Sequence, residues 1–356
     1  MKIVHLITTI DLGGAERQLC TLAAAQAKLG HEVEVINLKG KSVLKQNFER
    51  NRVKVNSQVC NKNILYQVFW LFIYVNSNFE ILHAHLSRAE LISAIIKIKP
   101  KLIISKHNSE RLIPKGNIWL SRAMANLIFK RSNAVITISK AVKKFLISIS
   151  EIRDNEKVKI VYYAGENTNS FLNATRKRSL EICKYGTICR LEPQKDVETL
   201  LKAWQIHQKE FKNDELFIVG NGSLQISLQK FAKEFNLLNV KWLEPVLTVE
   251  NFYTNFDVFV LSTRYEGFGL VLLEAARFNL PIIASNNSSV PEVLGSDHPG
   301  LFETTNYFQL AKKLKDFRSD SAPLKFSQIN TQILEKFNIT KICDSIFDIY
   351  AKSIYV

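Results

Sequence analysis

The chain of 356 residues carries 48 lysines and arginines against 33 acidic residues, a formal net charge of +15, and 46% of its residues are hydrophobic. This composition excludes a disordered or fibrous protein, and the length suits two domains of ordinary size. The five cysteines include no pair spaced for metal binding, and their odd number argues against a disulfide framework, so a reducing cytoplasm is the expected location.

The first half of the chain alternates predicted strands and helices. Residues 3–8 are predicted as a strand and not as a signal peptide, because one lysine precedes a short apolar run without a small-residue cleavage signal. A helix is predicted over residues 15–29 and ends at Gly30. The further elements predicted in this half are strands at 33–38, 53–59, 81–84, 102–105, 134–138 and 158–163, and a helix at 118–129.

The most apolar stretch of the chain is ILYQVFWLFIYV, residues 64–75. It is about half the length needed to span a bilayer, and it contains Gln67. We expect a buried helix here, with shallow insertion into a membrane as the alternative.

The alternating pattern restarts after the polar stretch 167–178, which we interpret as a linker. It divides the chain into a first domain of residues 1–170, a second of residues 171–335 and a C-terminal helical segment of residues 336–356. The elements predicted in the second domain are strands at 182–188, 216–219, 258–261 and 282–284, and helices at 197–208, 224–235 and 270–278.

Alternation of this kind predicts an α/β fold. Right-handed crossovers between parallel strands cover both faces of a sheet with helices. Two doubly wound, Rossmann-like domains in series would face each other across a cleft, and ligands of such sheets bind at the carboxyl ends of the strands. We therefore sought the chemistry in loops that follow predicted strands.

The net charge is unevenly distributed. Residues 1–170 carry 26 basic against 12 acidic residues, a net of +14, which leaves +1 for the rest of the chain. Between Lys97 and Lys144, 12 basic residues accompany the single acid Glu110. Such a patch would attract an anionic membrane surface or a phosphorylated acceptor. The alternative is a solvated surface without a binding role. Nucleic acid is disfavoured, because no zinc-finger spacing, aromatic RNA-binding signature or basic zipper is present.

The first candidate loop, residues 8–17, contains Gly13 and Gly14 ahead of the first helix. Without side chains, these residues would let a phosphate or sugar approach backbone N–H groups at a helix N-terminus. An ordinary glycine turn is the alternative, because the loop lacks the spacing of a dinucleotide site.

The second candidate loop, residues 186–196, places Arg190 and Lys195 on a turn that leads into a helix. A diphosphate leaving group gathers negative charge as its bond to a sugar breaks, and two fixed cations can stabilise that charge. Taken singly, each would be an ordinary surface side chain.

The third candidate loop, residues 264–276, places Glu266 in a turn and Glu274 one turn into the following helix. Gly267 and Gly269 permit the tight turn between them. Two carboxylates at one strand-end edge could accept hydrogen bonds from the hydroxyls of a sugar and a ribose. Acids in a first helical turn also stabilise the helix dipole, but the apolar neighbours of Glu274 imply burial, and a buried carboxylate needs partners.

Taken together, these residues resemble the retaining glycosyltransferases of family four, which have the two-Rossmann-domain GT-B fold. The resemblance covers nearly the whole chain in order, and the E-x7-E spacing of Glu266 and Glu274 is its most specific element. The other matching features are Gly13-Gly14, His83-Ala84-His85, the segment VITISK at 135–140, Arg190 with Lys195, and Gly220-Asn221-Gly222.

The resemblance implies roles for individual residues. Glu266 would hold the donor sugar, Glu274 the ribose, and Arg190 with Lys195 the diphosphate, with Gly14 opposite. His85 would lie near the reacting face of the sugar. The segment 339–355 would form a helix that returns to the first domain. The backbone implied to bind the nucleotide sugar is that of Gly13, Gly14, Gly220, Gly222, Gly267, Phe268, Gly269 and Leu270.

The chain departs from the family pattern at several places. Ala164-Gly165-Glu166-Asn167 stands for the usual Asn-Gly-Val-Asp, and Cys189 stands for the glycine before the clamp arginine. Ser288 and Ser289 stand where the family has two glycines ahead of a Pro-Glu pair, and Asn279 replaces the glycine of a later turn. These changes leave the clamp and the acidic pair intact.

The resemblance implies an enzyme that transfers a hexose or N-acetylhexosamine with retention. The donor would be a UDP-linked nucleotide sugar, and the acceptor a lipid-diphosphate-linked saccharide. The product would belong to a surface polysaccharide such as lipopolysaccharide. We expect it at the inner face of the cytoplasmic membrane, as a peripheral protein on the anionic surface. No metal or other cofactor is expected, because no Asp-x-Asp triplet or cluster of His and Cys ligands is apparent. A nucleotide-sugar epimerase of the same fold and a non-enzymatic basic membrane-binding or anion-binding protein are the alternatives.

Overall fold

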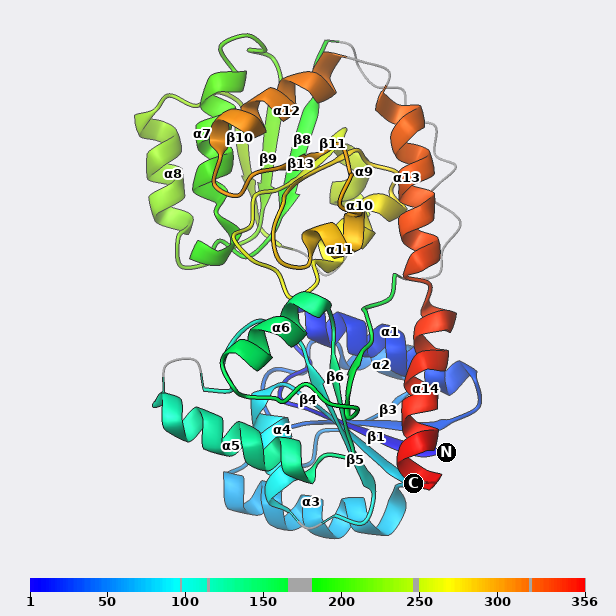
Figure 1. Cartoon of the computed structure of the whole chain (residues 1–356). Helices are drawn as coiled ribbons and strands as arrows, with labels where there is room; N and C mark the ends of the chain where they lie inside the picture. Colours follow the sequence, from blue (N-terminus) through cyan, green and yellow to red (C-terminus); the bar gives the residue numbers. More distant parts are fainter. Residues whose placement is uncertain (97, 114–115, 166–180, 246–249, 320–321, 356) are drawn as a thin grey trace. The chain divides into compact units, whose positions relative to one another are not determined.

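The computed structural model describes residues 1–96, 98–113, 116–165, 181–245, 250–319 and 322–355. The chain forms two compact units (Figure 1), which are Met1–Glu166 together with Phe337–Val356, and Asn167–Lys336. The predicted linker, residues 167–178, and the predicted boundary at residue 170 lie outside the described residues. Each unit is described by itself below.

The first unit is built on a seven-stranded parallel sheet with the order β3-β2-β1-β4-β5-β6-β7. Because the order reverses at β1 (Lys2–Ile7), right-handed crossovers place helices on both faces of the sheet. One face carries α1 (Gly14–Lys28) and α2 (Lys45–Arg50), and the other carries α3 (Ile64–Asn78), α4 (Ser87–Ile95) and α5 (Ile118–Arg131). The strands are β1 (Lys2–Ile7), β2 (Glu32–Asn37), β3 (Lys54–Asn56), β4 (Ile81–His85), β5 (Lys101–Lys106), β6 (Ala134–Thr137) and β7 (Val158–Ile160).

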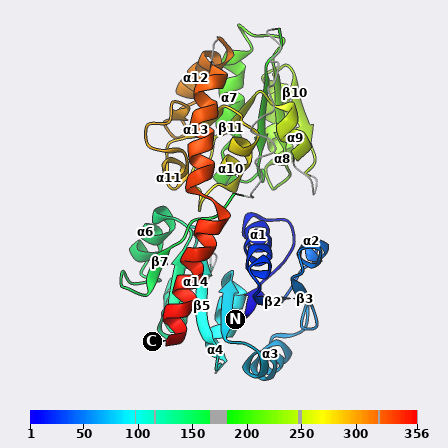
Figure 2. The ribbon, with the colours of Figure 1, turned by 90° about the vertical axis from the view of Figure 1, so that its right-hand side faces the viewer.

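The helices of the first unit include one from the far end of the sequence. The helix α14 packs beside α1 on the same side of the sheet (Figure 2), so that Ile346 and Tyr350 share a core with Leu22 and Ile81. The helices are α1 (Gly14–Lys28), α2 (Lys45–Arg50), α3 (Ile64–Asn78), α4 (Ser87–Ile95), α5 (Ile118–Arg131), α6 (Lys140–Ser148) and α14 (Ile339–Tyr355).

The second unit is built on a six-stranded parallel sheet with the order β10-β9-β8-β11-β12-β13. Its core gathers around the buried Trp204 and Tyr185. The strands are β8 (Lys184–Ile188), β9 (Glu215–Val219), β10 (Val240–Leu243), β11 (Val258–Leu261), β12 (Ile282–Ser285) and β13 (Leu301–Phe302). The helices are a 3-10 turn η1 (Pro193–Lys195), α7 (Val197–His207), α8 (Gln225–Glu234), α9 (Glu250–Asn255), α10 (Leu270–Arg277), α11 (Val290–Leu294), α12 (Tyr307–Ser319) and α13 (Ala322–Lys336).

The structure confirms the predicted α/β architecture with two Rossmann-like parallel sheets. The edge strands are its main differences from the prediction. β3 and β7 have only three residues each, and β10 and β13 were not predicted, because short edge strands carry weak apolar patterns. None of the helices in the described part of the chain combines the length and the hydrophobicity that crossing a membrane requires.

The predicted burial of the apolar stretch 64–75 is wrong in part. The stretch does form a helix, α3, but only Gln67, Leu71 and Val75 of it are buried. The opposite side of α3 exposes large apolar side chains to solvent, among them Leu65 and Phe69.

Candidate active site

The loop after β11 and the turn η1 meet in an ion pair. The Nζ of Lys195 contacts Oε1 of Glu266, and the two side chains are 14% and 7% exposed. Both residues follow strands of the second sheet, β8 and β11, which are neighbours in that sheet. Parallel neighbours end at the same edge, so the fold brings together two charges that lie 71 residues apart in the sequence.

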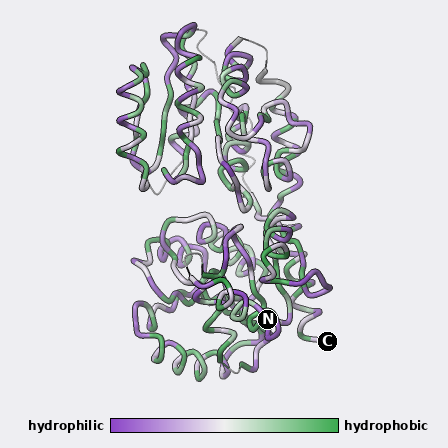
Figure 3. The backbone as a smooth tube through the Cα atoms, turned by 60° about the vertical axis from the view of Figure 1, so that its left-hand side comes forward, coloured by the Kyte–Doolittle hydropathy of each residue, from purple (hydrophilic) through white to green (hydrophobic). Residues whose placement is uncertain are grey.

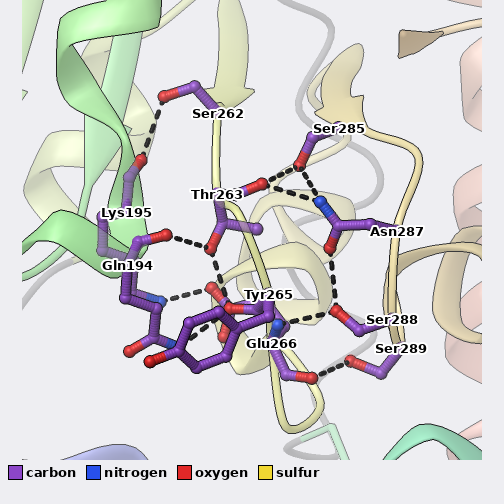
Figure 4. Close-up of polar contacts among 10 residues, drawn as sticks. All are labelled: Gln194, Lys195, Ser262, Thr263, Tyr265, Glu266, Ser285, Asn287, Ser288 and Ser289. Carbon is purple, nitrogen blue, oxygen red and sulfur yellow. Dashed lines mark hydrogen bonds and ion pairs between the residues drawn. The ribbon is translucent and has the colours of Figure 1, made fainter. Parts of the chain in front are cut away.

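The backbone around Glu266 is held by serine side chains (Figure 4). The N–H of Glu266 donates to Oγ of Ser288 at 2.9 Å, and Oγ of Ser289 donates to the carbonyl of Glu266 at 3.1 Å. Ser288 and Ser289 are the two residues that replace glycines of the family pattern. In this chain they fix the peptide groups on both sides of the carboxylate-bearing side chain.

The turn η1 is tied to the end of β11 by further hydrogen bonds. The hydroxyl of Thr263 donates to the carbonyl of Gln194 at 3.0 Å, and the side-chain amide of Gln194 donates to the carbonyl of Tyr265 at 2.8 Å (Figure 4). Asp196 adopts a left-handed conformation with φ of 47° and ends the turn directly before α7. Lys195 is therefore carried by a backbone that is bonded to the loop it faces.

Arg190 lies at the end of β8 with an exposed side chain. Among the described residues, no hydrogen bond or ion pair is formed by its guanidinium group. The neighbouring Glu192 instead accepts hydrogen bonds from the N–H and the hydroxyl of Ser223, which lower the pKa of its carboxyl. Arg190 is thus a cation at the same sheet edge as Lys195.

Gly220 and Gly222 are required by close packing of two strand-end loops. A Cβ on Gly220 would lie 1.8 Å from the carbonyl oxygen of Cys189, and Gly220 has a φ of 147°. A Cβ on Gly222 would lie 2.5 Å from the carbonyl oxygen of Leu191. A structural reason is therefore sufficient for both glycines, whether or not they also contact a ligand.

Glu274 lies in α10, half-buried, and its carboxylate has a partner of its own. The hydroxyl of the fully buried Tyr253, on α9, donates to Oε2 of Glu274 at 2.6 Å. Gly269, the N-cap of α10, has a φ of 90°, a conformation that favours glycine. Glu266 and Glu274 thus flank one tight turn, but each has a different partner.

Phe268 and Leu270 complete the segment expected to bind the donor. Phe268 is 2% exposed, so its side chain belongs to the core, and a ligand could meet only its backbone. Leu270 is the first residue of α10, and Gly267 lies in the loop that precedes it. The segment turns from the strand edge into the helix N-terminus, as the sequence predicts.

In the first unit, Gly13 and Gly14 begin α1 next to an acidic side chain. A Cβ on Gly13 would lie 2.2 Å from Oε2 of Glu16, and Oε1 of Glu16 accepts a hydrogen bond from Thr9 at 2.8 Å. A carboxylate already lies at this helix N-terminus, where it interacts favourably with the helix dipole. An anionic ligand would bind there only if Glu16 moved aside.

His85 is the last residue of β4 and is buried, with 2% of its surface exposed. Its Nε2 lies 3.0 Å from Nδ1 of His5, and its Nδ1 lies 2.9 Å from Nε2 of His107. His107 in turn contacts the hydroxyl of Tyr163 at 2.5 Å, and His5 contacts Oε1 of Gln26 at 2.7 Å. His85 is therefore in the middle of a row of hydrogen bonds and not at its exposed end.

The row continues to the C-terminal helix. The side-chain amide of Gln26 donates to the hydroxyl of Tyr350 at 3.4 Å, and that hydroxyl lies 2.6 Å from Nδ1 of His83. Nε2 of His83 lies 2.7 Å from the hydroxyl of Ser105. We call this set the histidine chain; its members in order are Tyr163, His107, His85, His5, Gln26, Tyr350, His83 and Ser105.

Burial keeps the imidazoles of the histidine chain neutral. It lowers the pKa of His5 to about 4 and that of His107 to about 3, and it lowers the pKa of His83 and His85 well below the usual value. A neutral imidazole donates one hydrogen bond and accepts one. With Oε1 of Gln26 as the acceptor at one end, His5, His85 and His107 each carry their proton on Nε2, and the hydroxyl of Tyr163 donates to His107.

Three of these imidazoles form a group that could hold a metal ion. Ligand atoms of His5, His83 and His85 all lie within 4.8 Å of one another. No cluster of His and Cys ligands is apparent in the sequence, where His5 lies far from the other two histidines. Their ring nitrogens already have hydrogen-bond partners within the protein. A metal would have to displace those partners in a site that is at most 2% exposed.

Comparison with known families accounts for both units. A family model described as Glycosyltransferase Family 4 matches residues 12–163, and one described as Glycosyl transferases group 1 matches residues 181–332. The chain is a glycosyltransferase with a family 4 domain and a group 1 domain. The resemblance inferred from the sequence is thereby confirmed, including the order of the two halves.

Relatives of this glycosyltransferase match over nearly its whole length. An uncharacterized glycosyltransferase of Haemophilus influenzae is 25% identical over 96% of this chain and 98% of its own. A Campylobacter jejuni enzyme, named as the N-acetyl-D-galactosaminyltransferase that acts on GalNAc-GalNAc-diNAcBac-PP-undecaprenol, is 28% identical over 88% of each chain.

Solved structures support the GT-B fold of this glycosyltransferase. The complex of Anabaena HepE with UDP-glucose superimposes with a TM-score of 0.82 at 19% identity, over 99% of this chain and all of that one. The structure titled TarM superimposes with a TM-score of 0.78 at 14% identity, over 98% and 99%.

The structure brings some of the predicted site residues of this glycosyltransferase together. Lys195 and Glu266 are in contact, and Arg190 shares their sheet edge. Sequence reasoning missed Tyr253, the partner of Glu274, and His107, which is half-buried at the end of β5 beside His85. The position of His107 two residues after the strand predicted at 102–105 was a signal that could have identified it.

Proposed function

We propose that this glycosyltransferase moves a hexose or N-acetylhexosamine from a UDP-sugar to a lipid-diphosphate-linked saccharide, with retention, in the synthesis of a cell-surface polysaccharide. The observation that carries the proposal is the buried pair of Lys195 and Glu266 at one sheet edge with the exposed Arg190. This arrangement offers cations for a diphosphate directly beside a carboxylate for a sugar.

Lys195 and Glu266 can act on the donor without separating. A lysine ammonium group has three protons, so Lys195 can keep its bond to Glu266 and donate others to a phosphate oxygen. As the bond between sugar and diphosphate breaks, the leaving group gains negative charge, which Lys195 and Arg190 stabilise. Glu266 meanwhile accepts hydrogen bonds from ring hydroxyls of the sugar.

Glu274 is proposed to bind the ribose of the nucleotide. Its carboxylate is half-buried and is oriented by Tyr253 through the 2.6 Å hydrogen bond. A carboxylate can accept from both hydroxyls of a ribose, and its oriented position reduces the entropy lost on binding. UDP as the nucleotide takes its support from the HepE complexes with UDP and UDP-glucose, which share this fold.

Retention is proposed from the family, in which the leaving phosphate helps to deprotonate the acceptor.

The role near the reacting sugar that the resemblance gives to His85 fits His107 better. Both histidines line one small pocket, but His85 is 2% exposed, whereas His107 is half-buried at the carboxyl end of β5. To position an acceptor hydroxyl there, neutral His107 would exchange its hydrogen bond from Tyr163 for one from the acceptor.

The acceptor is proposed to be a lipid-linked saccharide at the inner face of the cytoplasmic membrane. The names of the relatives support this: the Campylobacter enzyme acts on an undecaprenol-diphosphate saccharide, and others are named for amylovoran and capsular polysaccharide. Within the basic stretch that the sequence analysis singled out, Lys106 is buried against Glu90 at 2.5 Å. Lys99 and Lys130 are exposed and remain available to an anion.

The test combines binding and transfer. We expect UDP and UDP-sugars, but not GDP or ADP, to raise the melting temperature. The stabilising donor should then support transfer to a lipid-diphosphate saccharide, and NMR of the product should show the anomeric configuration of the donor. Glu266→Ala should abolish transfer with the fold retained, and Lys202→Ala, an exposed lysine of α7, should leave it unchanged. Release of an epimerised sugar in the absence of acceptor would instead show an epimerase.

A further inference from the structure

The helix α3 is oriented with the polar side chain of Gln67 directed into the protein. Gln67 is fully buried, and its side-chain amide donates to the carbonyls of Leu38 at 2.8 Å and Val59 at 2.9 Å. Its Oε1 accepts a hydrogen bond from Arg88 of α4 at 2.9 Å. Every hydrogen-bonding group of this amide is directed to the protein, so the rotational position of α3 on the sheet is fixed.

The outer side of α3 is a stripe of large apolar residues. Leu65, Phe69, Phe72 and Ile73 are 79%, 66%, 44% and 51% exposed. Their spacing of i, i+4, i+7 and i+8 places them on one side of the helix, opposite Gln67. The colouring in Figure 3 shows α3 as a mainly hydrophobic helix. Exposing so many large apolar side chains in one place is costly unless something covers them.

A second helix on the same side of the sheet also exposes large apolar side chains. On α5, Trp119 and Leu120 are 76% and 54% exposed. The helix α4 lies between α3 and α5, because Arg88 bonds to α3 and Arg131 of α5 donates to the carbonyl of Ala94 at 2.8 Å. We call the exposed side chains of the two outer helices the apolar face; they are Leu65, Phe69, Phe72, Ile73, Trp119 and Leu120.

Positive charges lie at both ends of α3. Lys62 is exposed just ahead of its N-cap, and the N–H of the exposed Lys99 donates to Oδ1 of Asn76 near its C-terminus at 2.6 Å. The helix itself contains no charged residue. A second copy of this chain on the apolar face would bring like charges together. An anionic lipid surface matches both the apolar stripe and its basic ends.

We propose that the apolar face docks on an anionic lipid bilayer, with α3 lying in the plane of the interface. The side chains of Leu65, Phe69 and Phe72 would enter the acyl boundary while Lys62 and Lys99 meet the headgroups. A 15-residue helix is about 22 Å long, shorter than the roughly 30 Å hydrocarbon core, so α3 suits an in-plane and not a spanning position. The inference deepens the proposed function, on which it rests only in supposing that the acceptor is presented by a lipid.

The test is flotation of the purified full chain with vesicles, without donor or acceptor. We expect binding to vesicles that contain phosphatidylglycerol and weaker binding to pure phosphatidylcholine. Phe69→Ser with Phe72→Ser should reduce the bound fraction at least about tenfold, because two buried aromatic anchors are lost. Phe308→Ser is the matched control, since Phe308 in α12 has the same 66% exposure as Phe69, and it should bind as the unsubstituted chain does.

Charge and apolar contributions are separated by a second variant. Lys62→Glu with Lys99→Glu should weaken binding to phosphatidylglycerol vesicles and leave the residual binding to phosphatidylcholine unchanged. Because all four side chains are exposed, the variants should keep the circular dichroism and the donor-induced thermal shift of the unsubstituted chain. Leu65→Ser gives a single-site check of the same surface.

Two results would overturn the docking proposal. One is unchanged vesicle binding by the Phe69 and Phe72 variant. The other is a lipid-free dimer that this variant converts to a monomer, which would assign the apolar face to a second copy. Neither result touches the proposed function, because donor binding and transfer to a detergent-solubilised acceptor are measured without vesicles.

Discussion

The ammonium group of Lys195 and the carboxylate of Glu266 form an ion pair in which both side chains are almost completely buried. Pairing two charges out of water is a weak source of stability, because desolvation opposes the Coulomb attraction. We interpret the pair of Lys195 and Glu266 as two charged groups held in position for the donor and not as a source of stability. The hydrogen bonds to Ser288 and Ser289 fix the backbone of Glu266 and serve the same end.

Removing one member of this pair should affect both activity and stability. We expect Lys195→Met to reduce kcat by about 10²–10³, the usual cost of losing one group that stabilises a developing negative charge. It should also destabilise the fold by about 3–5 kcal/mol, because Glu266 is left as an unpaired buried charge. Steady-state kinetics and urea unfolding measure the two effects. The double variant with Glu266→Gln should recover most of the stability and none of the activity; a double variant as unstable as the single one would contradict the explanation.

The two serines should matter through Glu266 and not through the ligand. Ser288→Gly with Ser289→Gly removes two hydrogen bonds to the backbone of Glu266, and we expect transfer to fall by about tenfold or more. Ser296→Gly, an exposed serine whose hydroxyl bonds only to its neighbour Asp297 among the described contacts, is the control. If the glycine variant retained full activity, the serines would have no positioning role.

Tyr253 should tune donor binding. Tyr253→Phe removes the hydroxyl that orients Glu274 and leaves the packed ring in place. We expect KM for the donor to rise by about tenfold with kcat little changed, because the ribose contact is made in the ground state and the transition state alike. A fall in kcat at unchanged KM would assign Glu274 to the reacting centre instead.

The histidine chain makes stability depend on pH. In the folded protein the pKa of His5 is about 4 and that of His107 about 3, against 6.5 for the unfolded chain. The unfolded state therefore binds more protons, so this stability is complete above pH 6.5 and is lost as the pH falls towards 4 and then 3. We expect His5→Asn to lower the unfolding free energy at pH 7 and to flatten its decline between pH 6.5 and 4, measured by urea titration at several pH values. An equally steep decline in the variant would contradict this assignment.

Transfer should not require an added metal. The three imidazoles of His5, His83 and His85 have partners within the protein, and Lys195 with Arg190 can supply the positive charge that a cation would bring to the diphosphate. We expect activity and melting temperature to be the same in EDTA and in zinc or magnesium. Loss of activity in EDTA, restored by one metal, would show that a metal takes part.

Local sequence patterns predicted the parts of the fold that depend on them. Alternating apolar strands and helices indicated two parallel sheets, and loops after strands led to Arg190, Lys195 and Glu266. The spacing of Glu266 and Glu274 around two glycines was readable because a strand–turn–helix unit is local. The family resemblance joined these pieces, and the family models confirm it.

The histidine chain could not be predicted, because it depends on register between strands. His5 of β1 is the partner of His83 in β4, and His85 of β4 is the partner of Ser105 in β5. A sequence shows each histidine alone on an apolar strand, where a core position is the simplest interpretation. The exposed side of α3 was missed for a related reason, since hydrophobicity alone does not show which side of a helix meets the sheet.

The attachment of α14 to the first sheet has a consequence for biosynthesis. Tyr350 lies between Gln26 and His83 in the histidine chain, and Phe337–Val356 belongs to the same compact unit as Met1–Glu166. The ribosome must therefore make the whole intervening unit before the earlier one can close over its buried imidazoles. Until then a nascent chain lacks the hydroxyl of Tyr350 that Gln26 and His83 contact in the folded protein.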